Sequence, residues 1–75
     1  MIFSGKILRA LRQLKGIKQQ VIATRLGISQ PAYSHIENRN YIDYEKFEQI
    51  LSVLGYSKKE YSDFIQNYSR QIIDN

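Results

Sequence analysis

The stretch 19–38, QQVIATRLGISQPAYSHIEN, constrains the fold more than any other part of the sequence, because it places two short helical patterns on either side of one glycine. The first pattern has apolar or small residues at helical spacing, namely Ile22, Ala23 and Leu26. Gly27 follows, and glycine readily adopts the left-handed conformation that ends a helix. Ser29 is a suitable N-cap for the next helix, and Pro31 stands in its first turn, where no backbone donor is missed. These signals predict two short helices joined by a tight turn.

A glutamine opens the first helix, a small residue lies at its middle, a glycine makes the turn, and Ser-Gln-Pro begins and Ile-Glu ends the second helix. In chain order these residues are Gln19, Ala23, Gly27, Ser29, Gln30, Pro31, Ile36 and Glu37. On these residues the chain resembles the Cro/phage-repressor (Xre-type) DNA-binding family, from about residue 8 to about residue 55. So many matches in a fixed order are more specific than an isolated motif. The resemblance implies an all-α fold, a compact five-helix repressor-like DNA-binding domain with the helix-turn-helix formed by helices two and three, residues 19–26 and 30–37.

Three further helices complete the predicted domain, over residues 4–15, 44–54 and 57–73. The first of them has an apolar stripe of Ile7, Leu8, Leu11 and Leu14. Asp43 is the predicted N-cap of the fourth helix, and Ser57 with Glu60 has the spacing of a reciprocal capping box at the start of the fifth. The chain is therefore predicted to be a single domain, residues 1–75, with a family core over about 4–55 and a long C-terminal helix over 57–73.

The composition argues against several kinds of chemistry. A chain of 75 residues fits one small domain, and the absence of cysteine excludes disulfides, thiolate metal sites and cysteine nucleophiles. With one histidine, no Gly-rich phosphate loop and no HExxH motif, we predict no metal, no cofactor and no enzymatic activity. No apolar run approaches the roughly 20 residues of a membrane span, and the opening MIFSGKIL is too short and interrupted for a signal peptide. A cytoplasmic protein is expected.

The net charge of +4 is unevenly distributed along the chain. Residues 1–40 carry seven lysines and arginines against one acidic residue, Glu37, which gives a net charge of +6. Residues 41–75 carry four basic against six acidic residues, which gives −2. The basic half contains the helix-turn-helix, as phosphate binding would require. The alternative interpretation is an ordinary solvated surface of basic helices.

By the resemblance, helix three is the recognition helix, and its N-terminal residues are expected to meet base edges in the major groove. The predicted base-contacting residues are Gln30, Pro31, Ser34 and His35. Gln30 is the best base reader, because its amide both donates and accepts and so pairs with adenine through two hydrogen bonds. His35 suits a bond to a base or a phosphate, and an exposed histidine with no role is the alternative. Tyr33 is expected in the core, with its hydroxyl at the rim.

The predicted phosphate-contacting residues lie at the start of helix two and after helix three; they are Lys18, Gln19, Asn38 and Arg39. Gln19 combines a polar side chain with free backbone N–H groups, which suit a phosphate oxygen. Lys18 offers no N-cap acceptor, so this helix end is either frayed or differently capped, and a phosphate contact is a further role for Lys18. The resemblance also implies a partly buried ion pair between Arg12 and Glu37, which ties helix one to helix three.

Helix five carries an apolar and aromatic stripe that consists of Tyr61, Phe64, Ile65, Tyr68 and Ile72. Part of this stripe is expected to close the core. Tyr68, Ile72 and Ile73 are the candidate homodimer interface, since aromatic residues are common interface anchors. The alternative is a helix that packs wholly on its own domain.

These observations predict a sequence-specific regulator of transcription, expected to be a repressor, that binds double-stranded DNA. As a homodimer it would place two recognition helices on a near-palindromic operator. The alternative is a protein-interaction module, such as the antitoxin of a toxin–antitoxin pair, with its partner on helix five. By the resemblance the two roles are compatible, because antitoxins commonly also bind DNA.

Overall fold

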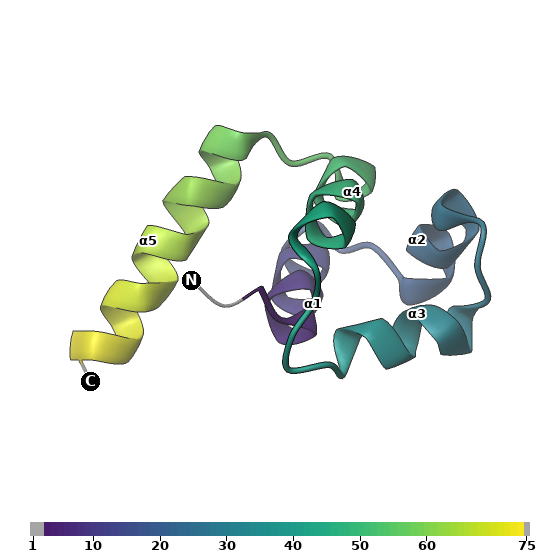
Figure 1. Cartoon of the computed structure of the whole chain (residues 1–75). Helices are drawn as coiled ribbons and strands as arrows, with labels where there is room; N and C mark the ends of the chain where they lie inside the picture. Colours follow the sequence, from purple (N-terminus) through teal and green to yellow (C-terminus); the bar gives the residue numbers. More distant parts are fainter. Residues whose placement is uncertain (1–2, 75) are drawn as a thin grey trace.

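The computed structural model describes residues 3–74, and the side chains of all of these except residues 65 and 68–74. This part of the chain contains α-helices and no strand, so the predicted all-α fold is confirmed. The helices are α1 (Gly5–Leu14), α2 (Gln19–Leu26), α3 (Gln30–Glu37), α4 (Tyr44–Leu54) and α5 (Lys58–Asp74). α1 and α4 lie in the middle of the molecule, with α2 and α3 at one end and α5 at the other (Figure 1).

Local sequence signals set several helix ends. The hydroxyl of Ser4 accepts a hydrogen bond from the backbone N–H of Ile7 at the start of α1, at 3.4 Å. At the start of α5, the N–H of Ser57 donates to the Glu60 carboxylate at 3.0 Å and the N–H of Glu60 donates to the Ser57 hydroxyl at 3.2 Å. The predicted capping box is therefore present. Asp43 holds the N-cap position of α4, but its side chain makes no capping hydrogen bond.

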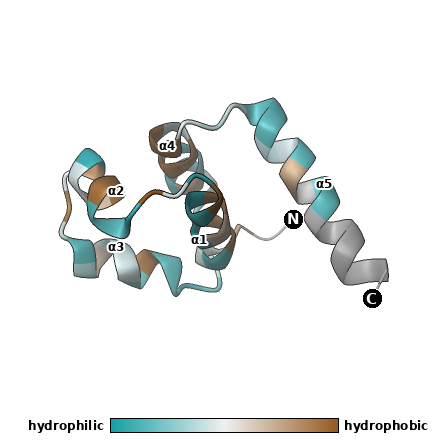
Figure 2. Ribbon diagram, turned by 180° about the vertical axis from the view of Figure 1, so that it is seen from behind, coloured by the Kyte–Doolittle hydropathy of each residue, from teal (hydrophilic) through white to brown (hydrophobic). Residues whose placement is uncertain are grey.

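The core lies between the first four helices and is closed by apolar side chains from each of them. Its buried members are Leu8, Leu11, Ile22, Ala23, Tyr33, Ile42, Phe47, Ile50, Leu51 and Leu54. α4 contributes the most apolar face, whereas α3 and the described part of α5 are mainly hydrophilic or intermediate (Figure 2). An amphipathic face that buries against neighbouring helices is the main source of stability for helices as short as these.

Leu14 does not belong to the buried face of α1, which corrects the predicted stripe. Its side chain is 68% exposed, whereas Leu8 and Leu11 are fully buried and Arg12 is nearly so. At 3.6 residues per turn, Leu14 lies about 200° around the helix from Arg12. α3 packs against the side of α1 that carries Arg12, so Leu14 is turned towards solvent.

The segment before α1 pairs with the loop that follows α3. The N–H of Gly5 donates to the carbonyl of Arg39 at 3.0 Å, and the N–H of Ile42 donates to the carbonyl of Phe3 at 2.6 Å. Gly5 itself is buried. These two bonds fix the N-terminal end of α1 against the C-terminal end of α3, and so help to set the orientation of α3.

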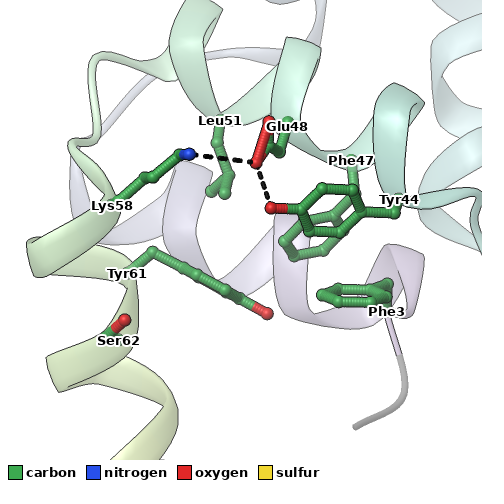
Figure 3. A pocket seen from close by; sticks show the side chains of 8 residues that line it. All are labelled: Phe3, Tyr44, Phe47, Glu48, Leu51, Lys58, Tyr61 and Ser62. Carbon is green, nitrogen blue, oxygen red and sulfur yellow. Dashed lines mark hydrogen bonds and ion pairs between the residues drawn. The ribbon is translucent and has the colours of Figure 1, made fainter.

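The first turns of α5 attach to the core through an aromatic cluster. The rings of Phe3 and Phe47 have centroids 5.1 Å apart, and those of Phe47 and Tyr61 are 5.2 Å apart. Tyr61 and Phe64 are half-buried against the core, so this part of the predicted stripe closes the domain. Next to the cluster, a cavity of about 220 Å³ opens between α4 and α5, with the Glu48–Lys58 ion pair at its edge (Figure 3).

Candidate nucleic-acid interface

α2 and α3 meet at a tight turn whose residues have separate tasks. Gly27 takes a φ of 73°, a left-handed conformation that L side chains rarely adopt, and thereby ends α2. The hydroxyl of Ser29 accepts a hydrogen bond from the N–H of Ala32 at 3.3 Å, so Ser29 caps α3. Ala23 is fully buried, and its small side chain allows the two helices to approach closely. The exposed start of α3 is thus held at a fixed angle to α2.

A buried ion pair joins α1 to the end of α3. The Nε of Arg12 donates to Oε2 of Glu37 at 2.7 Å, and Nη2 of Arg12 donates to Oε1 at 3.2 Å. Glu37 has no exposed surface, and the Arg12 side chain is 11% exposed. Nη1 of Arg12 also donates to the carbonyl of Ile17 at 2.6 Å. This forked geometry satisfies both carboxylate oxygens and gives the pair a single orientation.

Two glutamines extend this pair to the start of the recognition helix. The Nε2 of Gln19 donates to Oε1 of Glu37 at 2.9 Å, and the Nε2 of Gln30 donates to Oε1 of Gln19 at 2.8 Å. We call the four residues Arg12, Glu37, Gln19 and Gln30 the polar relay. Because Gln30 gives one N–H to the relay, its second N–H and its Oε1 remain for another partner.

The polar relay shifts the protonation equilibria of its charged members. Burial alone would raise the pKa of Glu37, but hydrogen bonds from Arg12 and Gln19 favour the carboxylate and leave its pKa below the ordinary value. The hydrogen bond to Glu37 raises the pKa of Arg12 in spite of its partial burial. Glu37 is therefore a charged anchor for the relay at neutral pH.

The hydroxyl of Tyr33 lies inside the domain, not at the rim as predicted. Tyr33 is fully buried, and its hydroxyl oxygen is buried with it, close to the carboxylate of Glu37. Burial raises the pKa of this phenol, and the nearby Glu37 carboxylate raises it further. The Tyr33 ring packs in the core under α3. Glu37 and Arg12 are buried as well, so the Tyr33 hydroxyl lies next to their charged groups and not in solvent.

The four predicted base-contacting residues all belong to α3. Pro31 and His35 are exposed, and Ser34 is half-buried. Gln30 is half-buried, because one side of its amide contacts Gln19. Within the part of the chain whose side chains are described, Gln30 is the predicted base reader whose side chain is held by a hydrogen bond to another side chain. The bond to Gln19 therefore fixes the orientation of the Gln30 amide.

The predicted phosphate-contacting residues fall into two groups. Lys18 is the exposed N-cap residue of α2 and makes no side-chain capping bond, and Gln19 is the first residue of that helix. Asn38 and Arg39 are exposed in the turn after α3. The side chain of Gln19 bonds to Glu37 and Gln30 in the polar relay. The backbone N–H groups at the start of α2 are therefore the groups there that are available to a phosphate.

Arg9 was not among the predicted site residues, although it touches the polar relay. Its Nε lies 3.4 Å from Oε1 of Glu37, and its Nη2 donates to Oδ1 of Asn38 at 2.5 Å. The spacing of three residues between Arg9 and Arg12 places both on one side of α1, and this is the signal in the sequence that could have indicated it.

The candidate dimer residues, Tyr68, Ile72 and Ile73, lie outside the residues whose side chains are described. In the described part of the chain, no helix has both the length and the apolar character that crossing a membrane requires. No group of three metal-ligating side chains occurs there either.

Comparison with known families agrees with the resemblance that the sequence motifs indicate. The sequence profile of a family described as helix-turn-helix matches residues 8–61, which is most of the chain. The chain belongs to the Cro/C1-type helix-turn-helix family. Members of this family are DNA-binding regulators and are generally not enzymes. Comparisons with curated proteins and with solved structures give no significant match.

Proposed function

We propose that this helix-turn-helix protein is a sequence-specific regulator of transcription, acting as a repressor, that reads the major groove of double-stranded DNA with α3. The observation that carries the proposal is the polar relay, which holds the amide of Gln30 at the start of α3 through a 2.8 Å bond to Gln19. A base reader whose side chain is already oriented loses less conformational freedom on binding than a free one. The unused N–H and Oε1 of Gln30 match the N7 and N6 groups of adenine.

The neighbours of Gln30 extend this contact along α3. Pro31 has no side-chain donor and suits apolar contact with a thymine methyl group. Ser34 and His35 lie one turn further along the helix and provide hydrogen bonds to bases. Specificity would thus come from a short row of residues at the start of α3.

Affinity would come from phosphate contacts on either side of this row. Lys18 and the backbone N–H groups at the start of α2, where Gln19 is the first residue, would bind one phosphate. Asn38 and Arg39 would bind another beyond the end of α3. The net charge of +6 on residues 1–40 supports such contacts, because charge neutralisation supplies much of the affinity for DNA.

We further propose that the chain acts in the cytoplasm as a homodimer on a near-palindromic operator. Two recognition helices related by a two-fold axis would enter successive major grooves, about 34 Å apart. The proposed interface includes Tyr68, Ile72 and Ile73 of α5, which continue the apolar pattern beyond the part of this helix that packs on the core. Because α5 lies at the opposite end from α2 and α3, such contacts leave the recognition surface open (Figure 1).

Selection of bound sequences from a random pool of double-stranded DNA tests this function. We expect enrichment of a near-palindromic motif, and binding to the winning sequence that falls steeply with rising salt. Analytical ultracentrifugation of the complex gives the number of chains on the site, with two expected. No enrichment, together with weak binding that is equal for all sequences, would contradict sequence-specific recognition.

The second candidate function is a protein-interaction module, such as an antitoxin with a toxin on α5. The cavity between α4 and α5 favours it, because aromatic rings and the Glu48–Lys58 pair line this cavity (Figure 3). In addition, α5 lies at the opposite end of the molecule from α2 and α3 (Figure 1). A partner gene product that co-purifies with the chain, and is lost after Tyr61→Ala while DNA binding persists, would support this function. A chain that purifies alone from its native host and binds an operator would argue against it.

A further inference from the structure

Arg9 contacts both the polar relay and the proposed phosphate-binding turn. From α1 its guanidinium reaches Glu37 at 3.4 Å and Asn38 at 2.5 Å, across a separation of 28 and 29 residues in the chain. The bond between Gly5 and Arg39 holds the start of α1 against the same turn. Arg9 therefore lies at the C-terminal end of α3, in contact with Asn38, which was predicted to bind phosphate.

The cluster around Glu37 carries an excess of positive charge. Glu37 is the single acidic residue among residues 1–40 and accepts from two arginines. Arg12 is the closer partner, at 2.7 Å, and its side chain is 11% exposed, whereas that of Arg9 is 38% exposed. One carboxylate balances one guanidinium, so the uncompensated charge resides on the arginine that solvent and phosphate can reach.

The same arginine also orients its neighbour. Because Oδ1 of Asn38 accepts from Arg9, the amide nitrogen of Asn38 is directed away from the guanidinium and keeps both of its donors. Asn38 is exposed at the C-cap of α3. Arg9 and Asn38 together thus present a pair of adjacent donor groups, and paired donors of this kind match the two free oxygens of a phosphodiester.

We propose that Arg9 is a phosphate-binding residue, and that it acts with Asn38 on one DNA phosphate beside the C-terminal end of α3. This inference rests on the proposed function, since it adds a contact to the same DNA interface. The guanidinium supplies charge and donors, and the amide nitrogen of Asn38 supplies a further donor. Because the ligand is the DNA backbone, this contact raises affinity for every sequence and does not select among them.

The test compares Arg9→Gln with Lys59→Gln, a matched loss of one charge at an exposed position on α5. The dissociation constant is measured against salt for the selected operator and for a random duplex of the same length. We expect Arg9→Gln to lower the magnitude of the slope of log K against log salt by about 1. Arg9→Gln should weaken binding to both duplexes by the same factor, whereas Lys59→Gln should keep the wild-type slope.

Arg9→Lys distinguishes the effect of the positive charge from the effect of the guanidinium hydrogen-bond donors. Lysine keeps the charge but not the planar guanidinium that binds Asn38. We expect a nearly wild-type slope with weaker binding to both duplexes. Wild-type affinity in Arg9→Lys would overturn the joint contact with Asn38, and this variant decides the matter even if Arg9→Gln fails to fold in a melting experiment.

The outcomes also separate this inference from the function on which it rests. If the wild-type chain binds the operator and a folded Arg9→Gln has the wild-type slope, the Arg9 contact is wrong and the proposed function stands. If the wild-type chain binds neither duplex, both are wrong. A reduced slope in Arg9→Gln, with no change in the preference for the operator, supports a contact to the backbone.

Discussion

Gly5 and Ile36 lie so close together that no side chain fits between them. A Cβ at Gly5 would clash with the carbonyl oxygen of Ile36 and would come within 2.7 Å of the Cα of Glu37. All of these atoms belong to backbone, which cannot rotate away as the end of a side chain does. The contact therefore fixes the distance between α1 and the end of α3.

Gly5→Ala is predicted to destabilise the fold by about 1–3 kcal/mol, the usual range for an overpacked core. Gly16→Ala is the matched control, because Gly16 has a φ of 65° and nothing within 4 Å of the added Cβ. The control should show only the cost of a left-handed backbone, about 1–2 kcal/mol. Chemical denaturation measures both free energies of unfolding. DNA affinity of Gly5→Ala is then compared with its fraction of folded protein. A loss of affinity larger than the loss of folded protein would show that α3 has moved.

Arg12→Ala is predicted to lower the free energy of unfolding by about 3 kcal/mol, because it leaves the buried carboxylate of Glu37 without its closest partner. Arg25→Ala serves as the control, since Arg25 is exposed and makes one bond of 3.3 Å to a carbonyl. This control should change stability by less than about 0.5 kcal/mol. Thermal melting without DNA compares the two. Equal melting temperatures for wild type and Arg12→Ala would show that the ion pair does not stabilise the fold.

The depressed pKa of Glu37 predicts a loss of stability in acid. Its pKa in the folded chain lies below the ordinary value of 4.5, so the stabilisation is complete above about pH 4.5. It is lost as the pH falls through the folded-state pKa, because the carboxylate must then take up a proton. Denaturation of wild type and Glu37→Gln across this range should show a constant difference in unfolding free energy above pH 5 and a shrinking one below pH 4.5. A difference that stays constant down to pH 2 would contradict the shift.

Gln30→Ala is predicted to weaken binding to the operator by about 1–3 kcal/mol and to relax specificity at one base pair. Gln49→Ala removes an exposed amide from α4 and should leave binding unchanged. Binding constants on the operator, and on operators changed at single positions, measure both effects. If Gln30→Ala weakens binding to random DNA by the same factor, Gln30 contacts the backbone and does not read a base.

Gln19→Ala removes the link between Gln30 and Glu37 and tests the polar relay itself. Operator affinity should fall although Gln30 is still present, because its amide is no longer oriented. A double-mutant cycle with Gln30→Ala should give a coupling energy of about 0.5–3 kcal/mol, as expected for residues in one hydrogen-bonded network. Additive losses would mean that Gln30 acts independently of the relay.

The sequence by itself determined where α2, α3 and α4 begin and end. Gly27, Ser29 and Gly55 act through backbone groups within three or four residues, so their signals are complete in the local sequence. For the same reason the turn between α2 and α3 was predictable, and with it the family. The resemblance also implied the contact between Arg12 and Glu37 that the structure records.

The tertiary structure alone decided two further contacts between polar side chains of different segments. Gln19 and Gln30 are 11 residues apart, and Arg9 and Asn38 are 29 apart, so no local pattern indicates either bond. The burial of the Tyr33 hydroxyl and the exposure of Leu14 likewise depend on which side of each helix its neighbours cover. Helical periodicity predicts that a helix has an apolar face. The angle at which a neighbouring helix packs against that face decides which residues at the edges of the face are buried.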